Sequence, residues 1–313
     1  MRCFWNSLFS VFLVSSFAEA SPGVFEINQA CVEIGCFEED TPGFPVTLSH
    51  PGTYILSSDL TVSDPTVGAI VMQTNNISLD LNRFTISGPV VCQGDPLTCA
   101  PSGPAVGVNG EFFENLRIEN GTIQGFSQWG LVTGPNGYVN GILSRGNYWI
   151  GINARAGTQV SNSKAVNNQH VGVSLAGTSI ATEIIARGNF TGVAMGCGTN
   201  EGCSALLDSN VSQNNLGVYD WGGALIRGNV ISMNLTRGIQ NINGWSTIDG
   251  NQVILNEGSG VMIGGGTAFS QPASPVVLRN NRISGHAINV DLGTDAQFVD
   301  AGGNVCGDSV SCN

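Results

Sequence analysis

Three consecutive residues, 219–221, place a carboxylic acid between two aromatic side chains. On a β-strand, Tyr219 and Trp221 would face one side and Asp220 the other. Two aromatic rings on one face can stack on sugar rings, and Asp220 is a candidate catalytic group beside them. Arg155 and Gln240 would add hydrogen bonds from flanking parts of the chain. We predict a ligand site at Tyr219, Trp221, Arg155 and Gln240, centred on residues 219–221.

Two further carboxylates, Glu183 and Asp208, occupy similar places in consecutive repeats of the chain. Side by side, two such acids could separate their pKa values and act as an acid–base pair. They could also hold Ca²⁺, although no motif supports this, and we expect no metal or other cofactor. The alternative is a structural ladder of ion pairs, because this column alternates in charge toward its end. The column reads Asn140, Ser161, Glu183, Asp208, Arg227, Asp249 and Arg279.

A repeat of about 21 residues must position these side chains. A glycine followed by an aliphatic residue recurs at intervals of 21, 21, 20, 25, 21, 22 and 27 residues. The copies are Gly130-Leu131, Gly151-Ile152, Gly172-Val173, Gly192-Val193, Gly217-Val218, Gly238-Ile239, Gly260-Val261 and a degenerate Ala287-Ile288. The two long intervals contain Cys197 with Cys203, and a proline-containing insertion at 268–275. Three short strands and three turns fit such a repeat, which is one coil of a parallel β-helix.

The repeat predicts which side chains face the interior. The aliphatic residue after each glycine, including Ile288, should point inward and pack on its copies about 4.8 Å above and below. The next residue should point outward, which places Tyr219, Gln240 and Asn289 on an exposed face. Asp220 is then nominally inward, where an unpaired carboxylate is costly. Either the local register shifts and exposes it, or Asn241, one coil further on, satisfies it. The alternative for the two aromatic residues is ordinary surface or core packing.

Asparagines accompany the repeat. They lie three or four residues before each repeat glycine, at Asn147, Asn168, Asn189, Asn214, Asn234 and Asn256. Such turns favour residues that tolerate left-handed backbone, and stacked amides can hydrogen-bond along the axis as a ladder. The alternative is N-glycosylation, since five asparagines begin N-x-S/T, at Asn76, Asn120, Asn189, Asn210 and Asn234. Because the asparagines follow the repeat, the ladder is the favoured interpretation.

The composition supports a chain of short strands and turns. The sequence contains 43 glycines, is 42% hydrophobic and only 11% charged, and has a net charge of −12. Glycine and asparagine disfavour helix interiors. The negative charge lacks the basic stripe that nucleic acid or an anionic membrane surface would require, so neither is an expected partner. We expect a monomer with no membrane span.

The N-terminus and the cysteines predict export. Residues 1–20 read as a signal peptide, with an apolar run and an Ala18-Glu19-Ala20 cleavage pattern before Ser21. The other eight cysteines are close neighbours in four pairs, which are Cys31/Cys36, Cys92/Cys99, Cys197/Cys203 and Cys306/Cys312. Zinc is the alternative, but no CxxC occurs and His is scarce. Local disulfides imply an oxidising compartment, so we expect a secreted protein, extracellular or periplasmic.

The opening coils resemble a known group. Pro-Gly-Thr-Tyr-Ile-Leu at 51–56, followed by Asn-Asn-Ile-Ser-Leu-Asp-Leu-Asn-Arg-Phe-Thr-Ile-Ser-Gly at 75–88, is similar to bacterial right-handed parallel β-helix repeat proteins. That group is related in fold to pectate lyases, and the resemblance covers about residues 45–305. It implies an all-β fold, a single-stranded right-handed parallel β-helix of about ten coils. We expect a cap at 21–50, the β-helix at 51–295 with an insertion at 89–104, and a second cap at 296–313.

The resemblance implies no particular reaction. The Asn-Thr-Asp, Asp-Asp and Gly-His-Gly motifs of polygalacturonase-like enzymes are absent, as are Trp-x-Asp-His of pectate lyases and Asp-Pro-His of alginate epimerases. His170 and His286 are lone histidines near turns and are expected to be structural. Two hypotheses remain. One is a protein that binds or processes extracellular polysaccharide, as a lyase or hydrolase if it is an enzyme. The other is a non-catalytic structural or adhesive module of the cell envelope.

Overall fold

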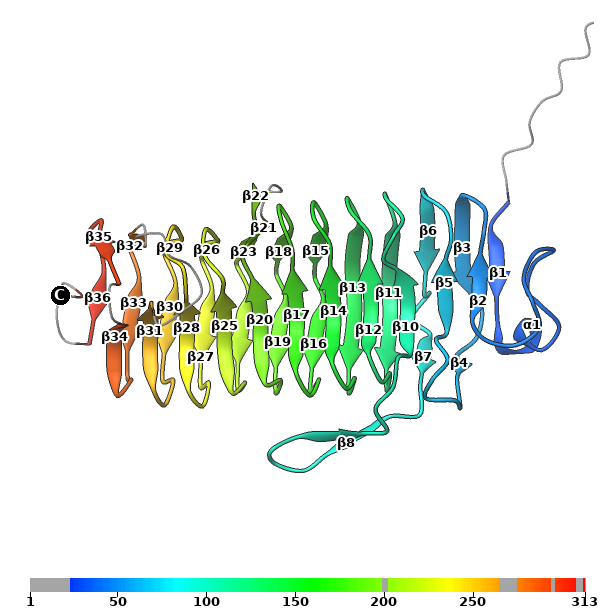
Figure 1. Cartoon of the computed structure of the whole chain (residues 1–313), viewed down its shortest axis with the longest axis horizontal. Helices are drawn as coiled ribbons and strands as arrows, with labels where there is room; N and C mark the ends of the chain where they lie inside the picture. The colour runs from blue at the N-terminus through cyan, green and yellow to red at the C-terminus, as the bar shows by residue number, and fades with distance from the viewer. Residues whose placement is uncertain (1–22, 199–201, 265–274, 294–295, 308–311, 313) are drawn as a thin grey trace, which may run out of the picture.

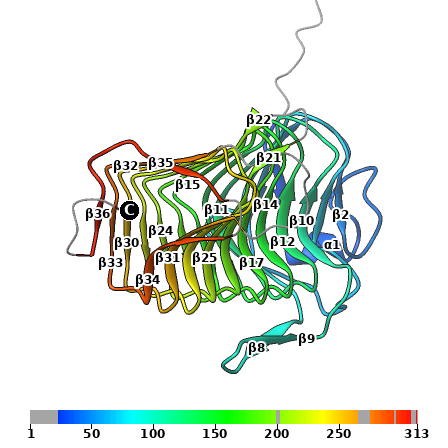
Figure 2. The ribbon, with the colours of Figure 1, turned by 60° about the vertical axis from the view of Figure 1, so that its left-hand side comes forward.

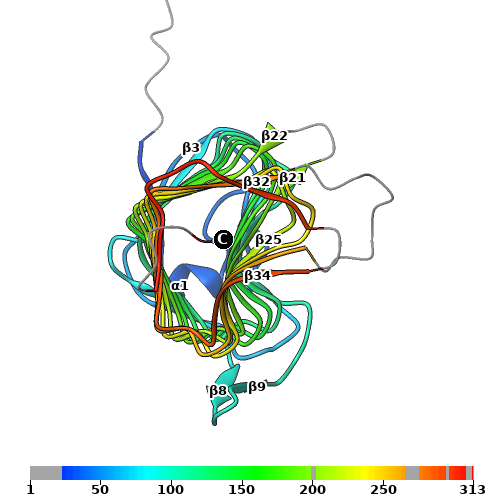
Figure 3. The same ribbon diagram turned by 90° about the vertical axis from the view of Figure 1, so that its left-hand side faces the viewer.

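The computed structural model describes residues 23–198, 202–264, 275–293, 296–307 and 312. Nearly all of its regular structure is β, arranged as parallel strands stacked along one long axis (Figure 1). Each coil contributes three short strands, so the cross-section has three faces (Figure 3). One face is an eleven-stranded ladder, which gives eleven coils against the ten predicted. The predicted β-helix architecture is confirmed.

Two faces follow one another in chain order within each coil. The first face comprises β1 (Phe25–Ile27), β3 (Gly52–Leu56), β6 (Ile77–Asp80), the first half of β11 (Arg117–Gln124), the first half of β13 (Tyr138–Arg145), β15 (Gln159–Ser161), β18 (Ile180–Thr182), β23 (Ala205–Leu207), β26 (Leu225–Arg227), β29 (Thr247–Asp249), β32 (Val276–Arg279) and β35 (Phe298–Asp300). The second face comprises β4 (Leu60–Thr61), β7 (Thr85–Ser87), the second halves of β11 and β13, β16 (Lys164–Val166), β19 (Ile185–Arg187), β24 (Asn210–Ser212), β27 (Val230–Ser232), β30 (Gln252–Ile254), β33 (Arg282–Ser284) and β36 (Val305–Cys306).

The third face holds the predicted ligand site, and Figure 2 shows its strands side by side. It comprises β2 (Val46–Leu48), β5 (Ile70–Met72), β10 (Val106–Gly110), β12 (Trp129–Thr133), β14 (Ile150–Ala154), β17 (Val171–Leu175), β20 (Thr191–Met195), β25 (Leu216–Asp220), β28 (Arg237–Asn241), β31 (Ser259–Ile263) and β34 (Ile288–Leu292). Every pairing in this face is parallel, with each strand bonded to its copies one coil before and after.

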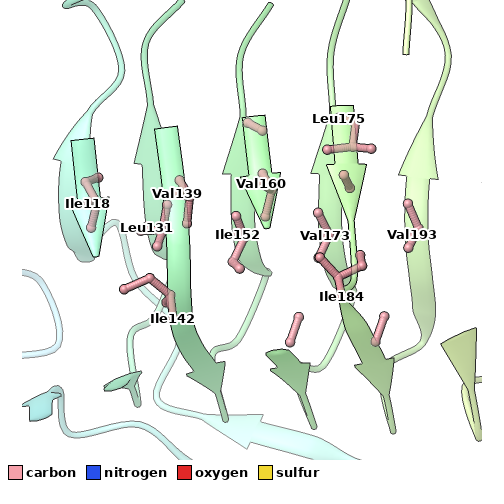
Figure 4. Close-up of a cluster of buried hydrophobic side chains, with 14 of the residues drawn as sticks. Ile118, Leu131, Val139, Ile142, Ile152, Val160, Val173, Leu175, Ile184 and Val193 are labelled. Carbon is pink, nitrogen blue, oxygen red and sulfur yellow. The ribbon is translucent and has the colours of Figure 1, made fainter. Parts of the chain in front are cut away.

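The core is the predicted inward stack. Leu131, Ile152, Val173 and Val193 lie in one row and are fully buried (Figure 4), as are Val218, Ile239 and Val261. The degenerate copy was placed wrongly, by two residues. Ile288 pairs with Ser259 and is 50% exposed, whereas Val290 pairs with Val261 and packs against the core. Asp291, rather than Asn289, is therefore the outward copy in this coil.

The repeat requires glycine at this position for a steric reason. A Cβ on Gly172 would lie 2.7 Å from the amide nitrogen of Asn189 and 2.6 Å from the carbonyl oxygen of Gly192. The glycine therefore faces the interior, as does the aliphatic residue after it, and the alternation of the strand is interrupted there. As a result, the residue before the glycine can point outward. Strict alternation would have placed that residue in the core.

The predicted asparagine ladder is confirmed. The six asparagines at 147, 168, 189, 214, 234 and 256 are buried, and each of the first five donates its side-chain amide to the side-chain oxygen of the next, at 2.8–3.1 Å. We call this turn, between the second and third faces, the second corner. Burial of Asn189 and Asn234 excludes glycosylation of these two residues in the folded chain, whereas Asn76, Asn120 and Asn210 are exposed. His286 continues the ladder by accepting the backbone N–H of Asn256 at 3.1 Å, which confirms its structural role.

A second ladder, which we did not predict, lies at the turn between the first and second faces. Asn229, Asn251, Asn281 and Asn304 are buried there, with successive amide bonds of 2.9–3.0 Å. The sequence signal is present, because each of these asparagines directly follows a left-handed residue of the turn, such as Gly228 or Gly250. The two ladders satisfy backbone N–H groups that the turns would otherwise leave unpaired.

Strand pairing extends beyond both predicted boundaries of the β-helix. At the N-terminal end, β1 pairs with β3 and β2 pairs with β5, although residues 21–50 were expected to be a cap. The capping element is the short helix α1 (Gln29–Val32), which Asn28 caps and which closes that end of the stack (Figure 3). At the other end, β35 and β36 continue the first two faces, although residues 296–313 were expected to be a cap.

The insertion at 89–104 forms an arm. Its strands β8 (Val91–Gln93) and β9 (Thr98–Ala100) form an antiparallel hairpin closed by the Cys92–Cys99 disulfide, and they project from the second corner (Figures 1 and 3). The other three predicted disulfides, Cys31–Cys36, Cys197–Cys203 and Cys306–Cys312, are also present. The Cys197–Cys203 pair closes a hairpin of β21 (Cys197–Gly198) and β22 (Gly202–Cys203). The predicted signal peptide lies outside the described residues, among which no helix is long and apolar enough to cross a membrane.

Candidate functional site

An open groove of about 630 Å³ lies on the outer side of the third face. It crosses the five strands β17, β20, β25, β28 and β31. We call it the main groove, and it is lined by Val171, Phe190, Thr191, Ala194, Asn215, Leu216, Tyr219, Trp221, Thr236, Arg237, Gln240, Gly258 and Ser259. Three of the four predicted binding residues, Tyr219, Trp221 and Gln240, therefore lie in one depression.

Tyr219 and Trp221 project from the same side of β25, as expected. Their ring centroids lie 5.0 Å apart and the rings are nearly perpendicular, at 86°. Trp221 is 51% exposed, so a ligand can reach the face of its indole ring. Partial burial raises the pKa of the Tyr219 hydroxyl, which keeps it protonated and able to donate a hydrogen bond at neutral pH.

Gln240 is the copy of Tyr219 on the next coil, and the two pair in register across β25 and β28. A cation that we did not predict holds its side chain. Arg237 donates from a guanidinium nitrogen to the Gln240 side-chain oxygen at 3.0 Å, and it also lines the main groove. Arg237 directly precedes the repeat glycine Gly238, the position that the interrupted alternation turns outward. A strict two-residue alternation of inward and outward side chains would have placed Arg237 in the core, and so it did not identify Arg237 as a groove residue.

Asp220 does not face the groove. It is fully buried at the end of β25, at the turn between the third face and the next coil. Its carboxylate accepts hydrogen bonds from the Asn241 amide at 2.8 Å, the Ser246 hydroxyl at 2.5 Å and the Gly222 backbone N–H at 2.8 Å. Of the two predicted possibilities, satisfaction by Asn241 holds and the register does not shift. Burial raises the pKa of Asp220, and these hydrogen bonds only partly offset it.

The placement of Asp220 corrects the prediction that it lies at the centre of the ligand site. The strand backbone separates its carboxylate from the outer surface, because alternate residues of a strand face opposite sides. The observed contacts fit a structural role at the turn, where three donors compensate a carboxylate that is shielded from water.

Arg155 also lies outside the main groove. Its guanidinium pairs with the carboxylate of Glu111, and both side chains are partly exposed. Glu111 follows β10 and Arg155 follows β14, so the pair bridges the intervening coil of β12 and extends toward the N-terminal end. Trp221 is three coils away in the opposite direction. Arg155 does lie in the same column as Trp221, as predicted. The prediction that it joins the Tyr219 cluster was wrong because its side chain pairs with Glu111 instead.

Glu183 and Asp208 lie one coil apart, but outside the column predicted for them. Thr182 pairs with Leu207, so the two acids occupy the next position, a left-handed turn at the surface. The ion-pair ladder is therefore shorter than predicted. Arg227 pairs in register with Asp249, and Asp249 with Arg279, whose guanidinium contacts the Asp249 carboxylate at 2.6 Å. This contact holds the pKa of Asp249 below its usual range.

Glu183 and Asp208 are both exposed to solvent at this turn. Within the described part of the chain, no three side chains of His, Cys, Asp or Glu gather as metal ligands would. Glu183 and Asp208 lie at the turn between the first and second faces, whereas the main groove is on the third.

A smaller cavity of about 250 Å³ adjoins the main groove. The two share Ala194 and Trp221, and the smaller one continues past Trp221 toward Met195 and Cys197 at the strand ends. Trp221 thus stands between two hollows on one surface, where a ligand could contact both faces of its ring.

Comparison with known proteins supports the fold. No protein-family model matches the chain, and no curated protein matches it in sequence. Among solved structures, the A-module of mannuronan C-5 epimerase AlgE6 from Azotobacter vinelandii is 14% identical with a TM-score of 0.53, covering 92% of this chain and 90% of that chain. Pectate lyase Pel9A is 14% identical with a TM-score of 0.56, covering 91% and 80%.

A third structure, the catalytic domain of a GH87 α-1,3-glucanase in complex with nigerose, is 10% identical with a TM-score of 0.52. The match covers 90% of this chain and 63% of that chain. The structural similarity establishes the fold, whereas sequence identities this low leave the reaction open. The chain is a right-handed parallel β-helix, similar in fold to polysaccharide-processing proteins.

Proposed function

We propose that this protein is secreted and that it binds an extracellular polysaccharide in the main groove. The observation that carries the proposal is the combination of the exposed Tyr219 and Trp221 rings with the Arg237–Gln240 pair in one open depression. Aromatic faces supply apolar contact to sugar rings, and fixed polar groups orient the hydroxyl or carboxylate substituents. The proteins similar in fold process mannuronan, pectate and α-1,3-glucan, which supports a glycan as the ligand class.

The geometry of the ladder suits a long, regular ligand. Tyr219 and Gln240 occupy equivalent positions on neighbouring strands, about 4.8 Å apart along the axis. A polysaccharide lying along the axis would present successive rings to successive coils. Among the described residues that line the main groove, Arg237 alone is charged, in a chain of net charge −12. It would therefore be the anchor for an acidic sugar, against a field that otherwise repels anions.

Binding without cleavage is the form of this function that the side chains favour. Glycoside hydrolysis generally uses two carboxylates flanking the bond, and none of the described residues that line the main groove carries one. Asp220 is shielded behind the strand, and the Tyr219 hydroxyl stays protonated at neutral pH. These observations favour a binding or adhesive module over a hydrolase. A lyase or epimerase reaction would need a base, and burial raises the pKa of the Tyr219 hydroxyl, which makes this group harder to ionise for that role.

Secretion rests on the disulfides. Four closed disulfides need an oxidising compartment to form and persist. The sequence pattern at residues 1–20 is that of an export signal. N-terminal sequencing of the exported protein would check that the signal is cleaved, since we expect the mature chain to begin at Ser21.

Binding to a defined panel tests the proposal. The purified protein is titrated with mannuronan, pectate and α-1,3-glucan, and the same titrations are run on a Tyr219→Ala/Trp221→Ala double variant. We expect at least one polymer to bind and the double variant to lose at least about tenfold in affinity, since buried aromatic anchors dominate such sites. Trp245→Ala is the matched control, because Trp245 is 70% exposed but does not line the main groove.

Equal affinity of the wild type and the double variant would remove the main groove from the proposal. The bound polymer is then incubated with the protein and assayed for new reducing ends and for unsaturated uronates. No product is expected if binding is the function. Product formation that Arg237→Ala abolishes would identify an enzyme in the same groove.

A further inference from the structure

A separate cavity of about 260 Å³ lies on the third face, nearer the N-terminal end. Trp129, Tyr148 and Trp149 line it on the β-helix, and Ser102 and Gly103 line it from the base of the disulfide-closed arm. Its volume is slightly below the range of about 300–1,000 Å³ typical of pockets for drug-sized ligands. It therefore suits one small ring better than a folded chain.

Trp129, which lines this cavity, carries an unpaired hydrogen-bond donor. Its indole Nε1 is buried and has no partner among the described residues. Buried polar groups are nearly always paired, because an unpaired one loses its bonds to water without replacement. A ligand that offers an oxygen to this N–H would recover that loss.

A strip of rings connects this cavity to the main groove. Trp149, His170 and Phe190 each directly precede the third-face strand of three consecutive coils, since Ile150, Val171 and Thr191 pair in register. The Trp149 and His170 rings lie 4.4 Å apart between centroids. Trp149 is 47% exposed and Phe190 is 58% exposed. Phe190 itself lines the main groove, so the aromatic strip is continuous with it.

The arm is held beside this strip. The backbone N–H of Cys99 donates to the side-chain oxygen of Gln169 at 2.7 Å, and Gln169 immediately precedes His170 in the chain. The sulfur of Cys99 lies 3.8 Å from the backbone oxygen of Asn147, which immediately precedes Tyr148. The arm is therefore held beside the aromatic strip at the second corner.

We propose that the polysaccharide groove continues along the aromatic strip and ends in a sugar subsite between Trp129, Trp149 and the base of the arm. This rests on the proposed function of the main groove. One sugar ring stacks on Trp149, and the Trp129 indole N–H donates to a ring or hydroxyl oxygen. From β12 to β31 the ligand crosses six coil steps, or roughly 29 Å at strand spacing. Only a long oligosaccharide can reach both ends.

Indole N–H resonances test this directly. The protein is labelled with ¹⁵N-tryptophan, and each signal is assigned by a Trp→Phe variant. Dimers and octamers of mannuronate, of galacturonate and of α-1,3-linked glucose are the probes. We expect a dimer to shift the Trp221 signal alone and the matching octamer to shift Trp129 and Trp149 as well. The Trp129 proton should move downfield as it gains an acceptor.

The outcomes separate the two proposals. If octamers shift Trp221 but leave Trp129 and Trp149 unchanged, the main groove stands and the subsite is overturned. If Trp129 and Trp149 shift while Trp221 does not, the subsite stands and the main groove is the wrong site. If no probe shifts any of the three signals, both proposals fail.

Affinity measurements give a second readout. Trp149→Ala should weaken octamer binding about fivefold to tenfold, the value of one aromatic contact, and leave dimer binding unchanged. Trp245→Ala, which removes an exposed indole ring that lines neither cavity, should affect neither affinity. An equal loss for dimer and octamer in Trp149→Ala would indicate a folding defect instead of a subsite, and would contradict the proposal.

Discussion

The two sides of strand β25 follow different rules. Inward, Val218 packs on Val193 and Ile239, and its neighbours on other coils are aliphatic as well. Outward, Tyr219 lies between Ala194 and Gln240, three side chains with nothing in common. The inner side is constrained because each residue must fit its own copies 4.8 Å away. The outer side meets only solvent or ligand, and there the chain varies from coil to coil.

Of the substitutions that test this difference, a charge on the inner side should lower the stability most. Val218→Asp places an unpaired carboxylate among fully buried aliphatic side chains and is expected to lower the free energy of unfolding by about 4 kcal/mol or more. Tyr219→Asp, one residue away on the outer side, should cost about 1 kcal/mol or less. Urea denaturation followed by circular dichroism measures both. Similar losses for the two variants would contradict the assigned register.

Removal of one buried polar side chain from the asparagine ladder should lower the stability by an intermediate amount. Asn214 donates to Asn234 and to the Ala186 carbonyl, and it accepts from Asn189. Asn214→Ala leaves several buried partners unpaired, so a loss of about 2–3 kcal/mol is expected. Asn215→Ala is the neighbouring control, since Asn215 faces the main groove. If both variants unfold at the same urea concentration, the ladder does not contribute to stability as described.

The smallest expected effect is a difference between two buried or paired aspartates in how they make the stability depend on pH. The folded-state pKa of Asp220 is raised above the ordinary value of 3.8, so the folded protein takes up this proton before the unfolded chain does. As the pH falls from neutral through the raised pKa toward 3.8, wild type should therefore gain stability relative to Asp220→Asn. The pKa of Asp249 is lowered, so wild type should instead lose stability relative to Asp249→Asn under acid. Urea midpoints of the three proteins, measured from neutral pH to well below pH 3.8, check the two signs, and parallel curves would contradict them.

The periodic part of the structure was accessible from the sequence. The spacing of Gly217, Gly238 and Gly260 predicted the coil, and the residues after them predicted the core, because stacking imposes one chemical type on each inward column. The misplacement of Ile288 shows the limit of this reasoning. The last copy lacks the repeat glycine, because Asn289 occupies the position of Gly260, so the alignment followed Ile288 instead of Val290.

The outer face was only partly accessible. Tyr219, Trp221 and Gln240 were brought together as the register predicted, since parallel pairing transfers a column from coil to coil. Arg237 was missed because the glycine after it interrupts the strand alternation. Arg155 was misassigned because its partner, Glu111, lies 44 residues earlier in the chain, in a coil before the regular repeats begin.

By itself, the sequence determined the coil length, the inward stack, the second-corner ladder and the disulfide pairs. All four follow from constraints between a residue and its own copies or near neighbours in the chain. Only the tertiary structure decided that Asp220 is enclosed, that Arg237 borders the main groove and that the arm lies against Gln169. These depend on contacts between different columns and across several coils, which no repeat imposes, because the outer surface of a solenoid has no periodic packing to satisfy.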